Sequence, residues 1–259
     1  MARFIEWCNS ENTAVGAYSF TVLTGNPANL AVGVQATSAV VPGHYVSGER
    51  VARALRKLGR PNAAAMIEEK LPTSKSIRSG DLGEILATEW INEHGNGYRA
   101  PIKRMRWKDH RNMAMRGEDV IGLLVDPETQ RLHFLKGEAK SRVALTSQVL
   151  SEARAGLDKE NGLPSQHALS FIADRLSEMG DEELADAIDD AQWKHGIAQQ
   201  NVRHLLFTFS GNAPGRFLSE SLRTYTGATS QLYVGLRIEG HAAFVQAVYE
   251  QVIANANEA

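Results

Sequence analysis

Cysteine is almost absent from this chain: Cys8 is the only one among 259 residues. A single cysteine excludes an intrachain disulfide bond and a cysteine-rich zinc site. No apolar run reaches the ~20 residues that a membrane-spanning helix needs. The first residues also lack the apolar stretch of a secretory signal, because Glu6, Trp7 and Asn9 follow at once. These absences favour a soluble cytoplasmic protein without a membrane partner.

Motifs of several common enzyme classes are also missing. The chain has no phosphate-binding GKT or GKS loop, no dinucleotide glycine fingerprint and no nucleophile elbow, and its 8 histidines show no HExxH or HxH spacing. Without a phosphate-binding loop, the chain cannot supply an ATP motor of its own. The net charge is −2, so contact with nucleic acid would have to come from a local basic patch.

Two neighbouring segments in the middle of the chain predict a β-hairpin. Residues 120–125 are apolar and rich in β-branched side chains, residues 126–130 have the composition of a turn, and residues 131–140 predict the second strand. A turn centred between Glu128 and Thr129 would pair Val125 with Leu132. The same register, continued to the other end of the hairpin, pairs residue 119 with residue 138.

This register brings Asp119, Glu138 and Lys140 to one face of the sheet. The Cβ atoms of the two acids are then about 5 Å apart, and Lys140 lies about 6–7 Å further along. Carboxylates this close repel each other unless a cation lies between them. We expect Asp119 and Glu138 to bind Mg²⁺, with Mn²⁺ as the alternative ion, and Lys140 to orient a water or to stabilise charge on a phosphate. An ordinary exposed Glu–Lys pair on an edge strand is the alternative.

A helix is expected before the hairpin, over residues 79–94, with Ser79 as its N-cap. Glu84 lies off the apolar stripe of this helix, and its pattern alone is typical of a solvated glutamate. Gly80 and Gly83 lie beside it. Because each glycine weakens a helix by up to ~1 kcal/mol relative to alanine, the pair indicates that something approaches the helix backbone there.

The pattern along the chain predicts an α/β fold with a mixed β-sheet flanked by helices. Further strands are expected at 203–209 and 231–238, and further helices at 143–160, 165–179, 181–195, 215–226 and 242–254. Earlier in the chain, residues 1–46 predict short strands and turns, and residues 48–70 predict a helix interrupted near Gly59. We therefore predict a smaller α+β N-terminal region, residues 1–75, as a candidate for partner docking, and a second domain, residues 76–259.

Two segments are strongly charged. Seven Lys and Arg residues lie between Arg99 and Arg116, interleaved with aromatic residues such as Trp107. Phosphate contacts need cations, and aromatic rings stack on bases. We therefore expect this segment to bind nucleic acid through Lys103, Arg104, Arg106, Lys108, Arg111 and Arg116, with a solvated loop as the alternative. The acidic run from Glu178 to Asp190 predicts a solvated helix face or a docking surface for a basic partner.

The order of the acids resembles the PD-(D/E)xK superfamily of restriction-endonuclease-like nucleases. A helix glutamate (Glu84) precedes an acid on one strand (Asp119), and the next strand carries an acid, a spacer and a lysine, Glu138-Ala139-Lys140. The resemblance implies a restriction-endonuclease-like fold in which Glu84 assists the metal or the water. The chain departs from the pattern by having Glu118, not proline, before Asp119; the hairpin register favours Asp119 as the ligand.

Four stretches resemble the HamA family, the nuclease subunits of the Hachiman anti-phage defence system: Arg78–Leu86, Arg99–Lys103, Arg116–Asp119 and Gly137–Ser141. The resemblance covers residues from about 75 to 259. It implies a metal-dependent DNA nuclease that is restrained by a helicase partner, HamB. Two other functions stay open at this point, namely a catalytically silent DNA-binding or regulatory subunit of a helicase complex and an RNA nuclease.

Overall fold

A computed structural model of the protein describes residues 1–258 and contains one mixed β-sheet. The strand order is β1-β2-β6-β5-β4-β3. The four inner strands run parallel, and β1 and β3 close the two edges as antiparallel partners of β2 and β4. The strands are β1 (Cys8–Val15), β2 (Tyr18–Gly25), β3 (Val120–Val125), β4 (Leu132–Arg142), β5 (Val202–Ser210) and β6 (Ser230–Arg237).

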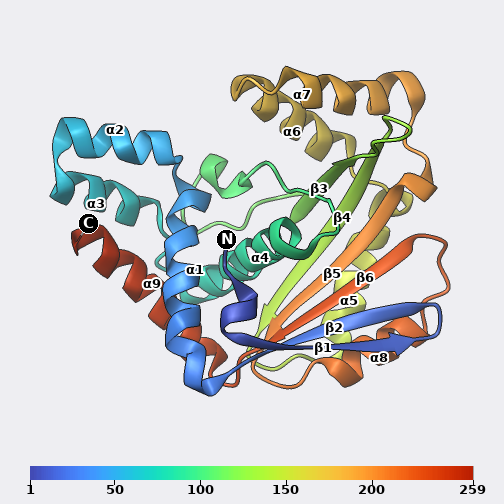
Figure 1. Cartoon of the computed structure of the whole chain (residues 1–259), viewed down its shortest axis with the longest axis horizontal. Coiled ribbons are helices and arrows are strands. Elements are labelled where there is room, and N and C mark those ends of the chain that lie inside the picture. Colours follow the sequence, from blue (N-terminus) through green and yellow to red (C-terminus); the bar gives the residue numbers. More distant parts are fainter. Residues whose placement is uncertain (259) are drawn as a thin grey trace.

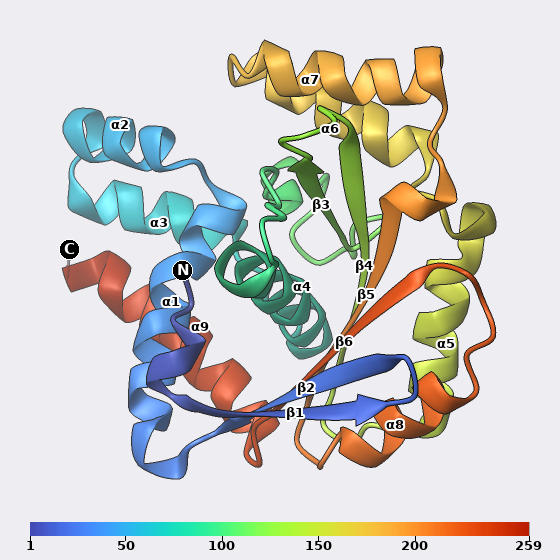
Figure 2. The same cartoon turned by 45° about the vertical axis from the view of Figure 1, so that its right-hand side comes forward.

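Helices cover both faces of the sheet (Figures 1 and 2). One layer is formed by α1 (Leu30–Tyr45), α4 (Lys75–His94) and α9 (His241–Glu258), and the opposite layer is formed by α5 (Ser147–Asp158) and α8 (Gly215–Arg223). The remaining helices are α2 (Gly48–Leu58), α3 (Arg60–Lys70), α6 (Gln166–Glu178) and α7 (Glu182–Asp189). Within residues 1–258, none of the helices combines the length and the apolar character that crossing a membrane requires. The predicted α/β fold with a mixed sheet is confirmed.

The N-terminal region shares the sheet and the core with the rest of the chain. β2 pairs in parallel with β6, and Trp7 and Leu23 belong to the same buried cluster as Leu86 of α4 and Val248 of α9. The boundary predicted near residue 75 therefore does not separate two hydrophobic cores. It marks only the short connection between α3 and α4.

Helix α1 corrects a second expectation for this region, since residues 1–46 were predicted to be strands and turns. Residues 30–34 are apolar and include β-branched valines and Gly33, a composition that favours a strand locally. In the folded protein this segment packs as a helix against α9 and α4. Tertiary packing thus overrides the local propensity. The predicted interruption at Gly59 is confirmed, because α2 and α3 meet there.

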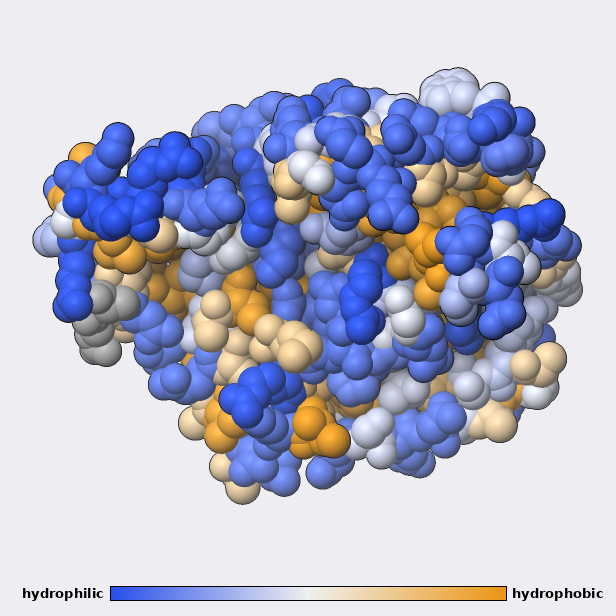
Figure 3. Space-filling model, turned by 45° about the horizontal axis from the view of Figure 1, so that its top comes forward, coloured by the Kyte–Doolittle hydropathy of each residue, from blue (hydrophilic) through white to orange (hydrophobic). Residues whose placement is uncertain are grey.

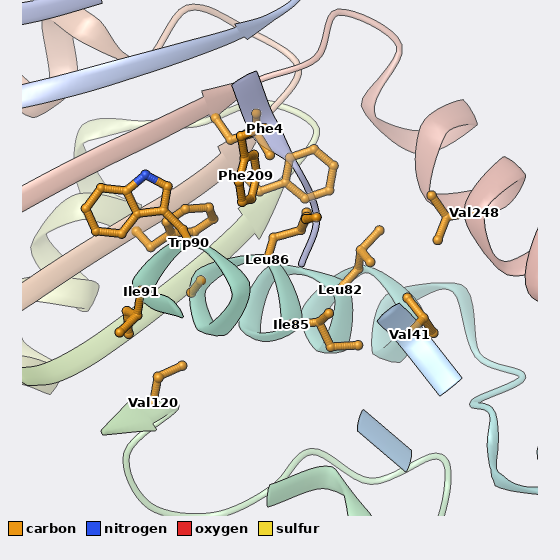
Figure 4. Close-up of a cluster of buried hydrophobic side chains, with 14 of the residues drawn as sticks. Phe4, Val41, Leu82, Ile85, Leu86, Trp90, Ile91, Val120, Phe209 and Val248 are labelled. Carbon is orange, nitrogen blue, oxygen red and sulfur yellow. The ribbon is translucent and has the colours of Figure 1, made fainter. Parts of the chain in front are cut away.

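Helix α4 is the central helix of the molecule, and core side chains surround it. Figure 4 shows Phe4 and Phe209 on one side of this helix and Val120 on another. The helix begins after Ser74, more than one turn before the predicted N-cap, Ser79. The Ser79 hydroxyl instead lies 2.8 Å from the Ser141 hydroxyl of β4. This contact fixes the first half of α4 beside the end of β4.

We predict that Gly33→Ala in α1 destabilises the protein by about 1–3 kcal/mol, as overpacking does. A Cβ atom at position 33 would lie 2.7 Å from the indole ring of Trp7. That ring is stacked between Phe4 and Phe244 and donates a hydrogen bond to the Ala2 carbonyl, so it cannot move aside easily. Urea denaturation of both variants measures the effect. As the matched control we choose Gly80→Ala in α4.

The control separates packing from helix propensity. No atom lies within 4 Å of a Cβ added at Gly80, so Gly80→Ala should be neutral or should stabilise the protein by up to ~1 kcal/mol. Equal stabilisation by both substitutions would contradict the close packing of Trp7 against α1.

Candidate active site

The hairpin of β3 and β4 has the predicted register. Val125 pairs with Leu132, and the ladder continues to Val120 opposite Gly137. Asp119 lies one residue beyond this last pair, and its Oδ2 accepts a hydrogen bond of 2.9 Å from the backbone N–H of Ala139. The carboxylate thus bonds the neighbouring strand where the backbone ladder ends. This contact holds Asp119 beside Glu138, the neighbour of Ala139.

Glu138 and Lys140 lie on β4 and contact each other through a salt bridge between Lys140 Nζ and Glu138 Oε1. Both side chains are mostly buried, with 16% of Glu138 and 21% of Lys140 exposed. Helix α5 forms a wall behind the carboxylate, because a Cβ atom added at Gly156 would lie 2.9 Å from Glu138 Cδ. The pair is therefore not an ordinary exposed Glu–Lys pair on a strand edge. It is held between the sheet and a helix.

Glu84 lies on α4 and interacts with Asp119. Burial raises the pKa of Glu84 well above its usual range, and the negative charge of Asp119 raises it further. Burial also raises the pKa of Asp119 to about 6, with repulsion from Glu138 as the next cause. The charge of Glu138 thus raises the pKa of Asp119, and the charge of Asp119 in turn raises the pKa of Glu84. The prediction that Glu84 lies on the same side as Asp119 is consistent with this electrostatic coupling, whereas the solvated position typical of its pattern is wrong.

The glycines beside Glu84 have different surroundings. A Cβ atom added at Gly83 would lie 3.0 Å from the Cβ of Ser141, whereas Gly80 has no neighbouring atom within 4 Å. The expected close approach to the α4 backbone therefore occurs at Gly83. Strand β4 makes this approach itself, and Gly83 thereby brings Glu84 close to the strand that carries Glu138.

Three acids on α4 differ in the partners that they contact. Asp81 binds Lys108 Nζ at 2.6–2.7 Å and accepts a bond from the Tyr45 hydroxyl. Glu89 contacts His44 at 2.9 Å and Lys103 at 3.2 Å. Glu84 has no ion pair within residues 1–258, and its buried Oε2 has no hydrogen-bond partner there. A buried carboxylate oxygen without a donor is costly, so Glu84 is the acid whose partner is missing.

Glu118, the neighbour of Asp119, has structural contacts of its own. Its carboxylate accepts hydrogen bonds from the backbone N–H and the hydroxyl of Ser165, at 2.7 and 2.8 Å. It also lies 4.0 Å from the buried ammonium group of Lys136. Ser165 is the N-cap of α6, so Glu118 ties the start of β3 to that helix. The structure therefore leaves Asp119, not Glu118, for the cluster with Glu138.

The donor set fits a hard divalent cation. Glu84, Asp119 and Glu138 offer only carboxylate oxygens, which Mg²⁺ and Mn²⁺ favour. As the side chains lie, no group of three or more His, Cys, Asp or Glu residues among residues 1–258 is arranged to hold a metal ion. Lys140 occupies one oxygen of Glu138. Binding of one ion by all three acids would therefore require their side chains to change position.

The predicted nucleic-acid-binding segment divides into two groups of cations. Lys103 and Lys108 bind the α4 acids Glu89 and Asp81, and Arg106 donates to the Gly43 carbonyl at 2.9 Å. Only 5% of the Lys108 side chain is exposed. These three cations anchor the segment to the protein, which revises the expectation that Lys108 in particular contacts DNA.

Arg104, Arg111 and Arg116 form the second group. Arg104 donates to the Arg116 carbonyl at 2.7 Å, and its charge lowers the pKa of both Asp119 and Glu84. Arg111 lies beside Glu69 at 3.5 Å, and Arg116 is exposed. Arg104 is thus the cation of the segment that faces the acids, and Arg116 lies beside it.

A cavity of about 450 Å³ opens beside Asp119. Its walls are formed by residues 99–116 (the basic segment), the start of β3 and α6. They include Arg104, Trp107, His167 and Phe171. No sequence signal predicts the α6 wall, because His167 and Phe171 lie about 50 residues after Asp119 in an ordinary amphipathic helix.

Two comparisons relate the chain to known proteins. The model of the HamA family matches residues 2–252. The chain is also similar to a Hachiman protein HamA from Bacillus cereus, with 27% identity over 184 residues. The aligned region covers 71% of this chain and 64% of that relative. The chain therefore spans less than two thirds of the length of the curated relative that it matches.

We predict that Asp119→Asn stabilises the protein by about 1–3 kcal/mol near pH 7 in the presence of a chelator. The folded-state pKa of Asp119 is raised from 3.8 to about 6 by burial and by Glu138. Its contribution to stability is therefore fully present below about pH 4 and is lost as the pH rises through about 6. The gain from asparagine should appear near pH 7 and vanish near pH 4, as measured by urea unfolding.

Asp126→Asn is the control, because its change in stability near pH 7 should have the opposite sign. The backbone N–H groups of Thr129 and Glu128 lower the pKa of Asp126, so its ionised form stabilises the folded state. Its replacement should cost stability near pH 7 and cost nothing at low pH. If Asp119→Asn followed the same course as Asp126→Asn, the repulsion among the three acids would be disproved.

Proposed function

Because the chain belongs to the HamA family, we propose that it is a metal-dependent DNA nuclease, the effector of an anti-phage defence complex, restrained by a helicase partner. The observation that carries this proposal is the series of contacts at the end of the β3–β4 hairpin: Lys140 pairs with Glu138, Glu138 acts on Asp119, and Asp119 acts on Glu84. The charge of Glu138 raises the pKa of Asp119, the charge of Asp119 raises the pKa of Glu84, and Lys140 lies beside Glu138. Within residues 1–258, Glu84 forms no ion pair.

Each of these residues has a distinct task in hydrolysis. Glu84, Asp119 and Glu138 would hold the divalent cation, which when bound polarises the phosphate and lowers the pKa of a coordinated water. Lys140, once released from Glu138, stabilises the negative charge that develops on the phosphate. Water adds to phosphorus, a P–O bond breaks, and the departing oxygen takes up a proton. The products are one strand with a terminal phosphate and one with a hydroxyl.

Contact with the DNA backbone is proposed for the outward cations, Arg104, Arg111 and Arg116. Phosphate contacts do not depend on sequence and weaken as salt rises. Of these three cations, Arg104 is the one whose charge lowers the pKa of both Asp119 and Glu84. A phosphate bound by Arg104 and Arg116 would therefore lie beside the proposed metal.

Restraint by a second subunit follows from the lack of sequence-specific features. A nuclease that contacts only the DNA backbone would cut host DNA, and the chain has no phosphate-binding loop with which to use ATP as a gate. The family resemblance names a helicase, HamB, as that subunit. Two surfaces are candidates for docking it: the acidic face of α7 and its flanks, Glu178 to Asp190, which is exposed, and the outer surface of residues 1–75.

One experiment tests the nuclease and its restraint together. The purified chain is incubated with supercoiled plasmid, with Mg²⁺, Mn²⁺ or EDTA, and with or without the helicase subunit. We expect nicking that requires the cation and decreases when the helicase is bound in the absence of damaged or foreign DNA. Binding without cutting would favour a silent regulatory subunit, and cleavage of RNA alone would favour an RNA nuclease.

We predict that Glu138→Ala and Lys140→Ala each reduce the rate of Mg²⁺-dependent cleavage by about 10²-fold or more. Glu138→Ala removes a proposed metal ligand, and Lys140→Ala removes the cation at the developing charge. The readout is the initial rate of plasmid nicking, with thermal unfolding as a check of the fold. Glu128→Ala, on the exposed turn between β3 and β4, is the matched control and should cut at the wild-type rate. Wild-type cleavage by either folded site variant would refute the assignment.

Gly156→Ala tests the same site without removing a charge. The added methyl group would lie 2.9 Å from Glu138 Cδ, so the carboxylate must move. A shift of about 1 Å at a reacting group can lower the rate by 10²-fold, and we predict a loss of at least tenfold. Stability should not fall, because alanine favours the helix. Gly80→Ala is the control, and equal cleavage by both variants would show that the position of Glu138 does not matter.

A further inference from the structure

The cavity beside Asp119 is lined by both polar and apolar residues. Arg104, Arg116 and Asp119 lie among its polar residues, and Ile102, Trp107 and Phe171 are among its apolar ones. Its volume of about 450 Å³ is within the range of about 300–1,000 Å³ that is typical of small-molecule pockets. It is therefore large enough for a nucleoside, and Asp119 of the proposed site of cleavage is among its lining residues.

Two aromatic rings on different elements line the cavity. Trp107 lies within the basic segment, and Phe171 lies on α6; their rings are 5.8 Å apart and perpendicular to each other. The guanidinium group of Arg175 lies over both rings, at 5.5 and 5.4 Å from their centres. Aromatic side chains of this kind stack on nucleobases, whatever their sequence. The rings are held in place before any ligand arrives.

Figure 3 shows a surface that is mainly hydrophilic, with small apolar patches. A cavity lined by aromatic residues and by cations suits an occupant that is flat and apolar on its faces and carries a negative charge at one end. A nucleotide has these properties, with its base for Trp107 and Phe171 and its phosphate for Arg104 and Arg116. A base inside a duplex cannot enter such a recess unless it leaves the stack.

We propose that this cavity binds the base of an unpaired nucleotide next to the phosphate that is cut, so that the substrate is single-stranded or locally unwound DNA. This inference rests on the proposed nuclease function, because Asp119 forms part of the cavity wall. It also explains why a helicase is a suitable partner: strand separation produces the unpaired nucleotide that the cavity receives.

Binding is measured in the Glu138→Ala background, so that the strand stays intact. The probe is a short oligodeoxynucleotide that contains 2-aminopurine, offered as a single strand or as a duplex. We expect the single strand to bind about tenfold more tightly than the duplex, because base–aromatic stacking is lost in the duplex. The fluorescence of 2-aminopurine should decrease as its base stacks in the cavity.

Two substitutions on α6 isolate the cavity. Ala168 lines it, and Ala168→Leu fills it without removing a charge or an aromatic ring. Gln166→Leu introduces the same side chain on an exposed position of the same helix, outside the cavity lining. We expect Ala168→Leu to lose the preference for the single strand and the change in fluorescence, and Gln166→Leu to keep both. Thermal unfolding checks that both variants are folded, and Phe171→Ala serves as an independent variant if Ala168→Leu does not fold.

The outcomes separate this inference from the proposed function. If Ala168→Leu and Gln166→Leu bind the single strand equally, or if the duplex binds as tightly, the cavity is not a base pocket, whatever the nuclease assays show. Tighter binding of an RNA strand of the same sequence would overturn the assignment to DNA. If instead cleavage is insensitive to Glu138→Ala while the cavity variants behave as expected, the nuclease assignment fails and the base pocket stands.

Discussion

Buried carboxylates on α4 must each find a positive partner, and the arrangement of the site follows from this requirement. Taking an ionised carboxylate out of water costs several kcal/mol unless it is paired. Lys108 and Lys103 meet this need for Asp81 and Glu89, and they thereby tie the basic segment to the central helix. Glu84, between them in sequence, has no ion-pair partner within residues 1–258. The fold thus leaves one unpaired carboxyl group beside Asp119, where a divalent cation would stabilise its ionised form.

The hairpin brings the second half of the site to this charge. Because the backbone ladder ends at Val120, the Asp119 side chain bonds the neighbouring strand and stays close to both Glu138 and Glu84. The charge of Glu138 raises the pKa of Asp119, and the charge of Asp119 raises the pKa of Glu84. Repulsion of this kind would be released by a bound cation, so the contacts that destabilise the ionised acids would provide affinity for the proposed metal.

The parts of this structure that could be predicted from the sequence are those fixed by local rules. The period of two in a strand and the turn around Pro127 determine the hairpin register, and with it the place of Glu138 and Lys140. Helix α1 could not be predicted, since packing on α9 outweighs the strand-like composition of residues 30–34. The partners of the basic segment could not be predicted either, because Lys108 and Asp81 are 27 residues apart in the sequence and Arg106 and Gly43 are 63 apart. Composition cannot distinguish such anchors from free cations.

The division of the basic segment determines how its mutants are to be interpreted. A substitution at Lys103 or Lys108 leaves Glu89 or Asp81 with a lost ion pair in the core, and breaking a buried pair typically costs about 3–5 kcal/mol. Reduced DNA binding by such a variant would report unfolding as much as a lost phosphate contact. Arg116 is exposed, and Arg104 donates to a carbonyl at the surface, so these two report on binding more directly. The segment is therefore both a structural clamp on α4 and the cationic edge of the cavity, and the clamp holds that edge beside Asp119.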